Sequence, residues 1–145
     1  MVQHHTGMCV TDLERSTRFY VDGLGFTHVT DLHPPDAPVD TFFGLDAPLG
    51  LTVRFLAKDG FVLELFAFAT GSDDSSPTDR TMRSPGLTHL SLTFDDIDAA
   101  AAAAQAAGGT VMPGRIEGAA VLVRDPDGLQ IELLPAGFHQ RELGV

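Results

Sequence analysis

The sequence predicts a single α+β domain built from two βαβββ modules. A length of 145 residues suits one domain with a real core. Strand and helix patterns follow one another in the same order twice along the chain, and each copy ends in an apolar strand with a central glutamate. Equivalent residues of the two copies keep an offset of 84 positions: His5 and His89, Asp12 and Asp96, and Gly25 and Gly109.

The first module is expected over residues 1–70. Asp12 is a good N-cap for a helix that Gly23 and Gly25 then end. The pair Asp59-Gly60 is typical of a tight hairpin turn. A loop rich in proline and aspartate is expected between residues 31 and 48. The other expected elements are strands at residues 2–10 and 26–30, a helix at 13–21, and hairpin strands at 51–57 and 61–69.

A linker is expected at residues 71–86, where Gly, Ser, Asp, Pro and Arg show no periodicity. The second module follows over residues 87–135, and residues 136–145 form a tail. Asp96 caps an alanine-rich helix, and alanine favours both helix formation and close packing on a sheet. The expected elements are strands at residues 86–94, from 110 onward, at 119–124 and at 129–134, and a helix at about 97–107.

The composition excludes several classes of partner. A net charge of −11 repels phosphate backbones, which argues against nucleic acid, and it disfavours a polyanionic substrate unless local arginines hold one. No apolar run is long enough to cross a bilayer and no leader-like segment opens the chain, so a cytoplasmic protein with no membrane partner is expected. The single cysteine, Cys9, cannot form an internal disulfide, and its strand pattern predicts a buried side chain.

Strand alternation identifies the candidate functional residues. Glu64 and Glu132 each fall opposite their apolar neighbours on a strand, and His89 shares a face with Ser91 and Thr93. A lone strand glutamate often faces solvent, and a lone strand histidine is more often structural than a ligand. Their repetition at equivalent places in both modules, together with His5, favours a metal site instead, because a buried carboxylate needs a partner or a metal.

Imidazole nitrogen and carboxylate oxygen suit a divalent ion of zinc, nickel, cobalt, manganese or iron, with zinc as the default. The candidate metal ligands are His5, Glu64, His89 and Glu132. His4 adjoins His5 but has the opposite strand parity, so it is not included. The histidines that lie in or beside loops are interpreted as surface residues: His28, His33 and His139.

Two stretches of the chain resemble a known family. The first runs from His5 through Asp12 to Gly23-Leu-Gly-Phe, and the second includes Gly-Leu-Thr-His89-Leu-Ser-Leu-Thr-Phe-Asp and Asp-Pro-Asp-Gly-Leu-Gln-Ile-Glu132-Leu. Both are similar to the vicinal oxygen chelate superfamily, which includes glyoxalase I, methylmalonyl-CoA epimerase, extradiol dioxygenases and the fosfomycin and bleomycin resistance proteins. The resemblance covers nearly the whole chain.

The resemblance implies a curved half-barrel-type sheet around a metal-binding cleft. In that family the first-strand histidine (or glutamine) and the last-strand glutamate of each module supply the ligands, which carries over to His5, Glu64, His89 and Glu132. Such a metal polarises a carbonyl and stabilises an adjacent enolate, while Glu64 or Glu132 moves the proton. The first hypothesis is therefore a glyoxalase I-like or epimerase-like lyase or isomerase acting on a small carbonyl compound.

Two other classes stay open. An Fe(II) extradiol dioxygenase resembles a triad of two histidines and one carboxylate, but Glu64 would fill one position that catechol or oxygen needs. A non-catalytic binding or resistance protein tends to lack the complete ligand set. Within the first class, the apolar segment Leu65-Phe-Ala-Phe-Ala and the long 33–48 loop depart from glyoxalase I, which puts a glutathione adduct in doubt.

A homodimer is expected, because two open sheets leave exposed edges and an apolar surface that a second copy can cover. Relatives build the metal site either within one chain or across two. The sequence does not distinguish these arrangements, nor does it identify the substrate, the metal or the catalytic glutamate.

Overall fold

The computed structural model describes residues 2–72 and 81–138. Parts of the predicted linker (71–86) and tail (136–145) therefore lie outside the described residues. The first module contains β1 (Thr6–Cys9), α1 (Leu13–Arg18), the π-helical turn η1 (Phe19–Gly23), β2 (Thr27–Leu32), α2 (Asp36–Phe43), β3 (Leu51–Lys58) and β4 (Phe61–Phe68). The second module contains β5 (His89–Phe94), α3 (Ile97–Ala106), β6 (Thr110–Ile116), β7 (Ala120–Arg124) and β8 (Gln130–Pro135).

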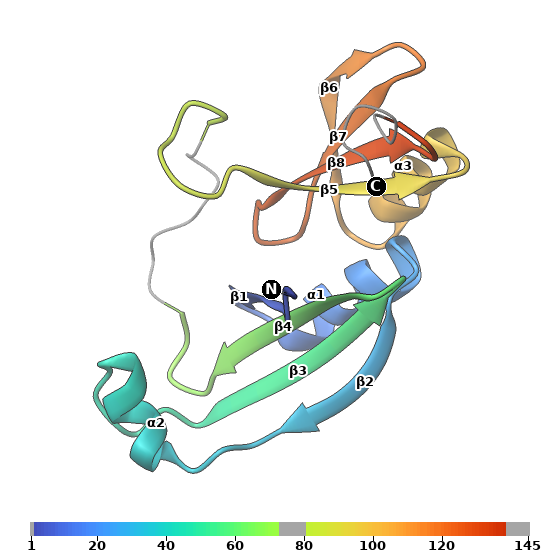
Figure 1. The fold of residues 1–145 in the computed structure, drawn as a ribbon. Coiled ribbons are helices and arrows are strands. Elements are labelled where there is room, and N and C mark those ends of the chain that lie inside the picture. Colours follow the sequence, from blue (N-terminus) through green and yellow to red (C-terminus); the bar gives the residue numbers. More distant parts are fainter. Residues whose placement is uncertain (1, 73–80, 139–145) are drawn as a thin grey trace.

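The strands form two four-stranded mixed sheets (Figure 1). Sheet A has the order β1-β4-β3-β2, and sheet B repeats it as β5-β8-β7-β6. In each sheet the first strand runs parallel to the last, and the remaining neighbours are antiparallel. The sheets are open and do not close into a barrel. The predicted α+β fold of two βαβββ modules is confirmed.

Both predicted N-caps are present. The Asp12 carboxylate accepts a hydrogen bond from the backbone N–H of Arg15 at 2.9 Å, and this bond lowers the pKa of Asp12. The Asp96 carboxylate likewise accepts from the N–H groups of Asp98 and Ala99. The two aspartates thus start the two helices at equivalent places in the modules.

Two expectations from the sequence were wrong. Residues 31–48 are not only a loop, because they contain α2, which starts after Pro35 and ends at Gly44 in the left-handed conformation (φ 67°). The prolines that suggested a loop occupy the start of the helix and a kink at Ala37, where proline is tolerated. Cys9 is exposed, because it alternates with half-buried positions on the short edge strand β1.

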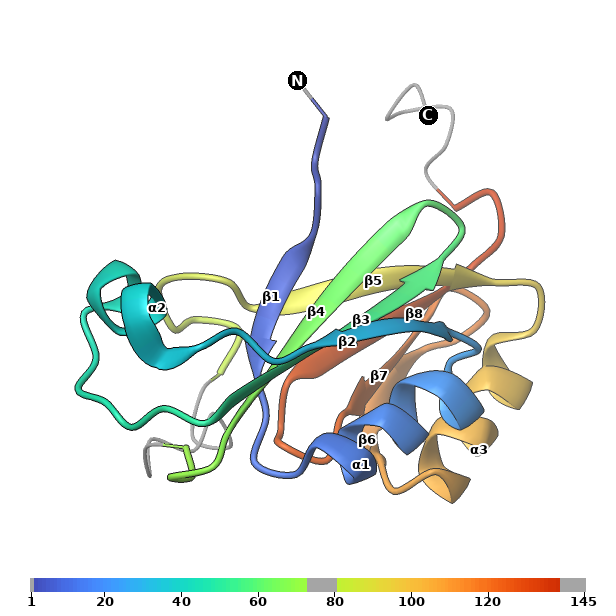
Figure 2. The same cartoon turned by 90° about the horizontal axis from the view of Figure 1, so that it is seen from below.

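One core joins the two modules. Helices α1 and α3 each lie on one face of their own sheet, and α3 packs against η1 (Figures 1 and 2). Gly23 permits this contact, since a Cβ there would lie 3.0 Å from the Cβ of Ala107 and 3.1 Å from the Cα of Ala104. The shared core includes Leu56, Leu63 and Leu65 of sheet A, Phe19 and Tyr20 of η1, and Val121, Val123, Ile131 and Leu133 of sheet B.

A buried polar contact fixes the second module on the first. The Tyr20 hydroxyl, which is fully buried, donates to the Asp125 carboxylate at 2.8 Å. The other oxygen of Asp125 accepts from the N–H groups of Asp127 and Leu129. Burial raises the pKa of Asp125 and raises the pKa of Tyr20 well above its usual value. The turn between β7 and β8 is thereby attached to η1.

The same turn also holds the start of α1. Asp127 accepts a hydrogen bond from the Arg15 guanidinium at 2.6 Å, from the Ser16 hydroxyl at 3.2 Å and from the Thr11 hydroxyl. The carboxylate thus contacts the residues on both sides of the Asp12 cap. These contacts can form only when the two modules have this relative placement.

In sheet A, Arg54 connects β3 to β2 and to α1. Its Nε and Nη2 donate to the Asp31 carboxylate at 2.8 and 2.7 Å, and its Nη1 donates to Glu14 at 2.8 Å. The hydrogen bonds from Arg54, assisted by His28, lower the pKa of Asp31 to about 2. No helix in the described part of the chain is long and apolar enough to cross a bilayer.

We expect Tyr20→Phe to lower the free energy of unfolding by about 1–3 kcal/mol, because a buried oxygen of Asp125 loses its donor. Denaturant unfolding monitored by circular dichroism measures the change. Thr27→Val, which removes a hydroxyl from an exposed strand position, serves as the control and should stay within about 0.5 kcal/mol. Equal small effects in both variants would show that the buried contact does not stabilise the module interface.

We expect Asp31→Asn to lower the free energy of unfolding at pH 7 by about 1–2 kcal/mol, allowing for solvent screening of a partly exposed pair. The folded pKa of about 2 lies below the ordinary 3.8. The ion pair therefore stabilises the fold above about pH 4 and loses this effect as pH falls towards 2. Unfolding curves between pH 7 and 2.5 should converge for wild type and variant, and a difference independent of pH would contradict the assignment. Asp46→Asn at an exposed position is the matched control.

Candidate metal centre

The first His–Glu pair lies where β1 meets β4. His5 directly precedes β1, and the parallel register places Gly7 opposite Glu64 in the middle of β4. His5 Nε2 lies 3.0 Å from Glu64 Oε2. The Glu64 side chain is only 12% exposed, so its carboxylate is largely removed from water and needs a polar partner. The His5 ring supplies that partner. The Nδ1 atom of His5 lies 2.7 Å from Nδ1 of His4.

The second pair occupies the equivalent place in sheet B. His89 opens β5, Glu132 lies in β8, and His89 Nε2 is 3.6 Å from Glu132 Oε2. Ser91, which pairs with Glu132 in the register, donates its hydroxyl to Glu132 Oε2 at 2.7 Å. The Thr88 hydroxyl lies 2.9 Å from His89 Nδ1. The duplicated pattern of the sequence therefore corresponds to two similar pairs in space.

The donor atoms fit a divalent metal. Two ligands at about 2.0–2.2 Å from a zinc ion lie roughly 3.0–3.6 Å apart, depending on whether the geometry is octahedral or tetrahedral, and the nitrogen–oxygen distances of 3.0 and 3.6 Å fall within that range. In both pairs Nε2 faces the carboxylate while Nδ1 contacts a neighbouring side chain. This is how metal-binding histidines are held, with the second ring nitrogen fixed by another polar group. His4 contacts Nδ1 of His5, and Thr88 contacts Nδ1 of His89. Ser91 holds the carboxylate of Glu132 instead.

The sequence reasoning did not assign functions to His4, Thr88 or Ser91. His4 was set aside on strand parity, but the chain at this point precedes β1, so parity does not apply to it. Ser91 was placed on the face of His89, and its hydrogen bond to Glu132 follows from the parallel pairing of β5 with β8. The pairing of β5 with β8, if known, would have indicated this contact.

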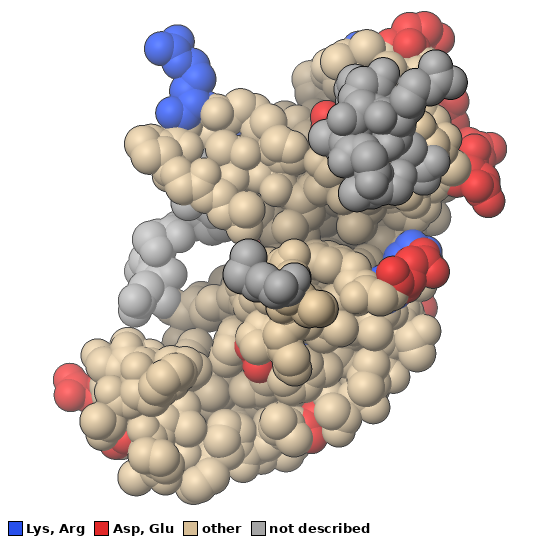
Figure 3. Space-filling model, in the orientation of Figure 1, with Lys and Arg blue, Asp and Glu red and all other residues tan. Residues whose placement is uncertain are grey.

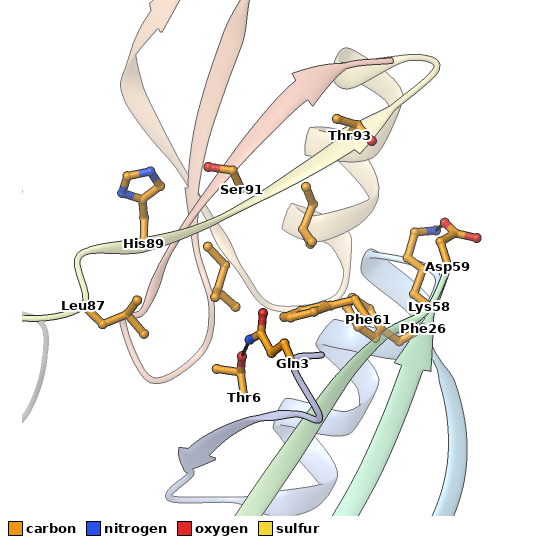
Figure 4. Close-up of a pocket in the computed structure, with 12 residues that line it drawn as sticks. Gln3, Thr6, Phe26, Lys58, Asp59, Phe61, Leu87, His89, Ser91 and Thr93 are labelled. Atoms are coloured by element: carbon orange, nitrogen blue, oxygen red, sulfur yellow. Dashed lines mark hydrogen bonds and ion pairs between the residues drawn. The ribbon is translucent and has the colours of Figure 1, made fainter. Parts of the chain in front are cut away.

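The two pairs lie on outward-facing surfaces. We call the side of each sheet that carries its helix the helix face, and the other side the open face. Leu63 and Leu65 lie in the shared core, so alternation puts Glu64 on the open face of sheet A. Figure 4 shows His89 and Ser91 projecting from β5 away from the first module.

One chain therefore does not bring the four predicted ligands together. Among the residues that the structure describes, no three His, Cys, Asp or Glu side chains come close enough to hold a metal ion. Each module brings together two of the four predicted ligands, and the two pairs lie on different sheets. His5 with Glu64, and His89 with Glu132, are the two contacts that the structure does form.

A hollow of about 480 Å³ lies between the modules, beside the edge strands β1 and β5 (Figure 4). Of the four candidate ligands it touches only His89. Its polar rim includes Gln3, Thr6 and Lys58, and the Lys58 ammonium lies 5.4 Å from the centroid of the Phe94 ring. Its apolar lining comes from Phe26, Phe61, Leu87, Leu90 and Leu92. This hollow is distinct from the surface that carries Glu64.

The surroundings of the two pairs differ in polarity. The register places Val53, Phe55, Phe66 and Phe68 on the open face of sheet A with Glu64. In sheet B, the same reasoning places six side chains on the face of Glu132: Ser91, Thr93, Gln130, Leu122, Leu134 and Arg124. The first pair is therefore set mainly among aromatic rings, and the second among a mixture of hydroxyl, amide, guanidinium and aliphatic side chains.

Comparisons with known proteins agree with this fold. Residues 2–133 match the family described as the Glyoxalase/Bleomycin resistance protein/Dioxygenase superfamily. The uncharacterized protein YaeR of Escherichia coli K12 is 32% identical over 137 residues, which cover 90% of this chain and 92% of that protein.

Solved structures share the fold at lower identity. The trypanothione-dependent glyoxalase I of Leishmania major is 23% identical with a TM-score of 0.70, covering 97% of this chain and 90% of that one. A glyoxalase family protein from Bacillus cereus is 17% identical, with a TM-score of 0.75 and 92% of each chain covered. The fosfomycin resistance protein FosX of Mesorhizobium loti is 18% identical, with a TM-score of 0.64, covering 99% and 98%.

The family match spans both modules and includes all four candidate ligands. Together with the duplicated βαβββ topology, it confirms the resemblance seen in the sequence. The chain belongs to the glyoxalase/bleomycin resistance protein/dioxygenase superfamily, whose members are the vicinal oxygen chelate proteins.

Proposed function

We propose that this protein is a divalent-metal-dependent lyase or isomerase, of glyoxalase or epimerase type, that acts on a small carbonyl compound. The superfamily is largely enzymatic. The observation that supports the proposal most directly is the pair of preorganised His–Glu contacts at equivalent places in the two modules. The proposed metal ligands are His5, Glu64, His89 and Glu132.

We further propose that the complete site forms between two copies of the chain. His5 and Glu64 of one protomer would face His89 and Glu132 of its partner, because each pair lies on an open face and neither meets the other within one chain. A two-fold dimer builds two identical sites of this kind. Exposed apolar side chains near the sheets, including Val29 (60%), Leu87 (59%) and Ile116 (66%), are available to such an interface.

In this arrangement the bound metal would act as a Lewis acid that polarises the substrate carbonyl. The chain's own carboxylate then removes the proton from the adjacent carbon. We assign that step to Glu64. Ser91 fixes the orientation of Glu132 with a hydrogen bond at 2.7 Å, whereas Glu64 contacts His5 and is bordered by aromatic rings that do not hold its oxygens. Glu64 is therefore better able to turn towards the substrate.

We expect His5→Ala and His89→Ala each to lower metal content at least about tenfold, because directly bound ligands dominate affinity. Elemental analysis of the purified protein measures this. His33→Ala, at an exposed histidine of the first module, is the matched control and should retain metal. Equal metal content in His5→Ala and wild type would contradict the proposed site.

Coexpression of the two variants tests the two-chain arrangement. A mixed dimer of His5→Ala and His89→Ala contains one doubly altered site and one intact site, so about a quarter of the wild-type sites should be restored when the chains pair at random. No restoration above the separate variants would place the whole site within one chain.

We expect Glu64→Gln to keep metal but to lose proton exchange by about 10²- to 10⁴-fold, since an amide can occupy the position but cannot act as a base. Glu132→Gln should instead lose metal. Deuterium exchange next to the carbonyl of hydroxyacetone and of 2-hydroxyacetophenone, followed by NMR, measures the rates. Oxygen uptake with catechol would identify a dioxygenase, and ligand binding without turnover in any assay would identify a binding protein.

A further inference from the structure

We infer that the substrate carries a flat, uncharged apolar group, of about the size of a phenyl ring, that binds on the open face of sheet A beside His5 and Glu64. The inference rests on the proposed metal site, because the metal would fix the oxygen end of the substrate next to this surface. It goes further by assigning a substrate class and the residues that select it: Phe55, Phe66 and Phe43.

Aromatic rings border the first His–Glu pair. The Phe55 ring lies edge-to-face with the His5 ring, with centroids 6.1 Å apart, and the register places Phe55 opposite Glu64. The Phe66 ring lies over Gly7, where a Cβ would be 2.9 Å from a Phe66 ring carbon and 3.5 Å from Glu64 Oε2. Gly7 therefore leaves the space in which the ring and the carboxylate lie side by side.

Helix α2 closes the far end of this surface. The Phe43 ring packs edge-to-face on Phe66 with centroids 5.7 Å apart. Behind them, Leu49, Leu51 and Val53 form a second small core against which Val39, Phe55, Phe66 and Phe68 pack. Figure 1 shows α2 at the end of sheet A distant from α1. A group that starts at the metal ligands and runs along Phe66 thus reaches a wall at Phe43, which limits its length.

Among the described residues, sheet A and α2 offer this surface no lysine or arginine as a counter-charge for an anion. The strands of sheet A contain one arginine, Arg54, and one lysine, Lys58. Both alternate onto the helix face: Arg54 is paired with Asp31 and Glu14, and Lys58 borders the hollow between the modules. Helix α2 contributes the acidic residues Asp36 and Asp40, and Figure 3 shows no basic side chain over it.

An aromatic wall of this kind favours apolar area and rejects charge. Burying a side group of phenyl size tightens binding about ten- to a hundredfold, whereas an unpaired carboxylate against these rings would lose hydration without compensation. A peptide-like thiol adduct with free carboxylates is a poor match for this wall.

Hydroxamates test the inference, because they chelate a metal through two neighbouring oxygens and differ only in the attached group. The probes are acetohydroxamate, benzohydroxamate and 4-carboxybenzohydroxamate, titrated by calorimetry into the zinc-loaded dimer. We expect benzohydroxamate to bind about ten- to a hundredfold more tightly than acetohydroxamate. The carboxylated probe should lose at least about tenfold relative to benzohydroxamate.

Two variants assign the effect to the wall. Phe66→Leu keeps an apolar side chain in the packed strand but removes the ring, and should reduce the preference for benzohydroxamate severalfold while acetohydroxamate binding stays unchanged. Leu45→Ala removes an apolar side chain that follows α2 and is 45% exposed, and should leave both affinities unchanged. Thermal unfolding confirms that each variant is folded.

The outcomes separate this inference from the proposed function. Equal affinities for acetohydroxamate and benzohydroxamate, or a preference that Phe66→Leu does not alter, would overturn the aromatic wall while leaving the metal site intact. Failure of the wild type to retain zinc or to bind any hydroxamate would overturn the metal site itself, and the substrate class with it.

Discussion

The alternation of buried and outward-facing residues on the two glutamate strands determines how this protein can work. Leu63 and Leu65 flank Glu64, and all three positions are set by the pairing of β4 with β3 and β1. Both leucines are fully buried, and each contributes about 1.5–3 kcal/mol by leaving water. A shift of one residue in the register would expose them and bury the carboxylate. The core therefore fixes the direction of Glu64.

Sheet B repeats this constraint with Ile131 and Leu133 on either side of Glu132, and both are fully buried in the same core. Because one core serves both helix faces, the carboxylates must lie on the opposite, open faces. The alternation that makes each glutamate available to a metal also separates it from the second pair. In the proposed dimer, a second chain is therefore needed to bring a complete set of four ligands together.

Much of this organisation could be predicted from the sequence, because it depends on local patterns. The caps at Asp12 and Asp96, the turn at Asp59-Gly60 and the order of strands follow from residue type and spacing. The orientation of each glutamate follows from its immediate neighbours. Caps, turns and strand orientation each depend on a few neighbouring residues. The duplicated unit could therefore be recognised without knowledge of the fold.

The placement of one module relative to the other could not be predicted in the same way. It depends on contacts between residues about a hundred positions apart, such as Tyr20 with Asp125 and Arg15 with Asp127. Nothing in the local pattern of an aspartate in a turn indicates which tyrosine it accepts from. Helix α2 was missed for a different reason: its prolines and aspartates are typical of loops, and its stability comes from Phe43 and Val39 packing on sheet A.

The two modules are alike in topology but have different open faces, and this difference matters for chemistry. A substrate between them would meet aromatic rings on the side of Glu64. On the side of Glu132 it would meet a mixed face that carries Ser91, Thr93 and Gln130 together with Leu122, Leu134 and Arg124. The Glu132 carboxylate is held by the Ser91 hydroxyl and is therefore suited to remain a metal ligand. The Glu64 carboxylate has apolar rings beside it that donate no hydrogen bond, so it is freer to move when a substrate binds. Duplication would supply four equivalent ligands, and divergence of the two walls would then distinguish the base from the anchor and orient the substrate between them.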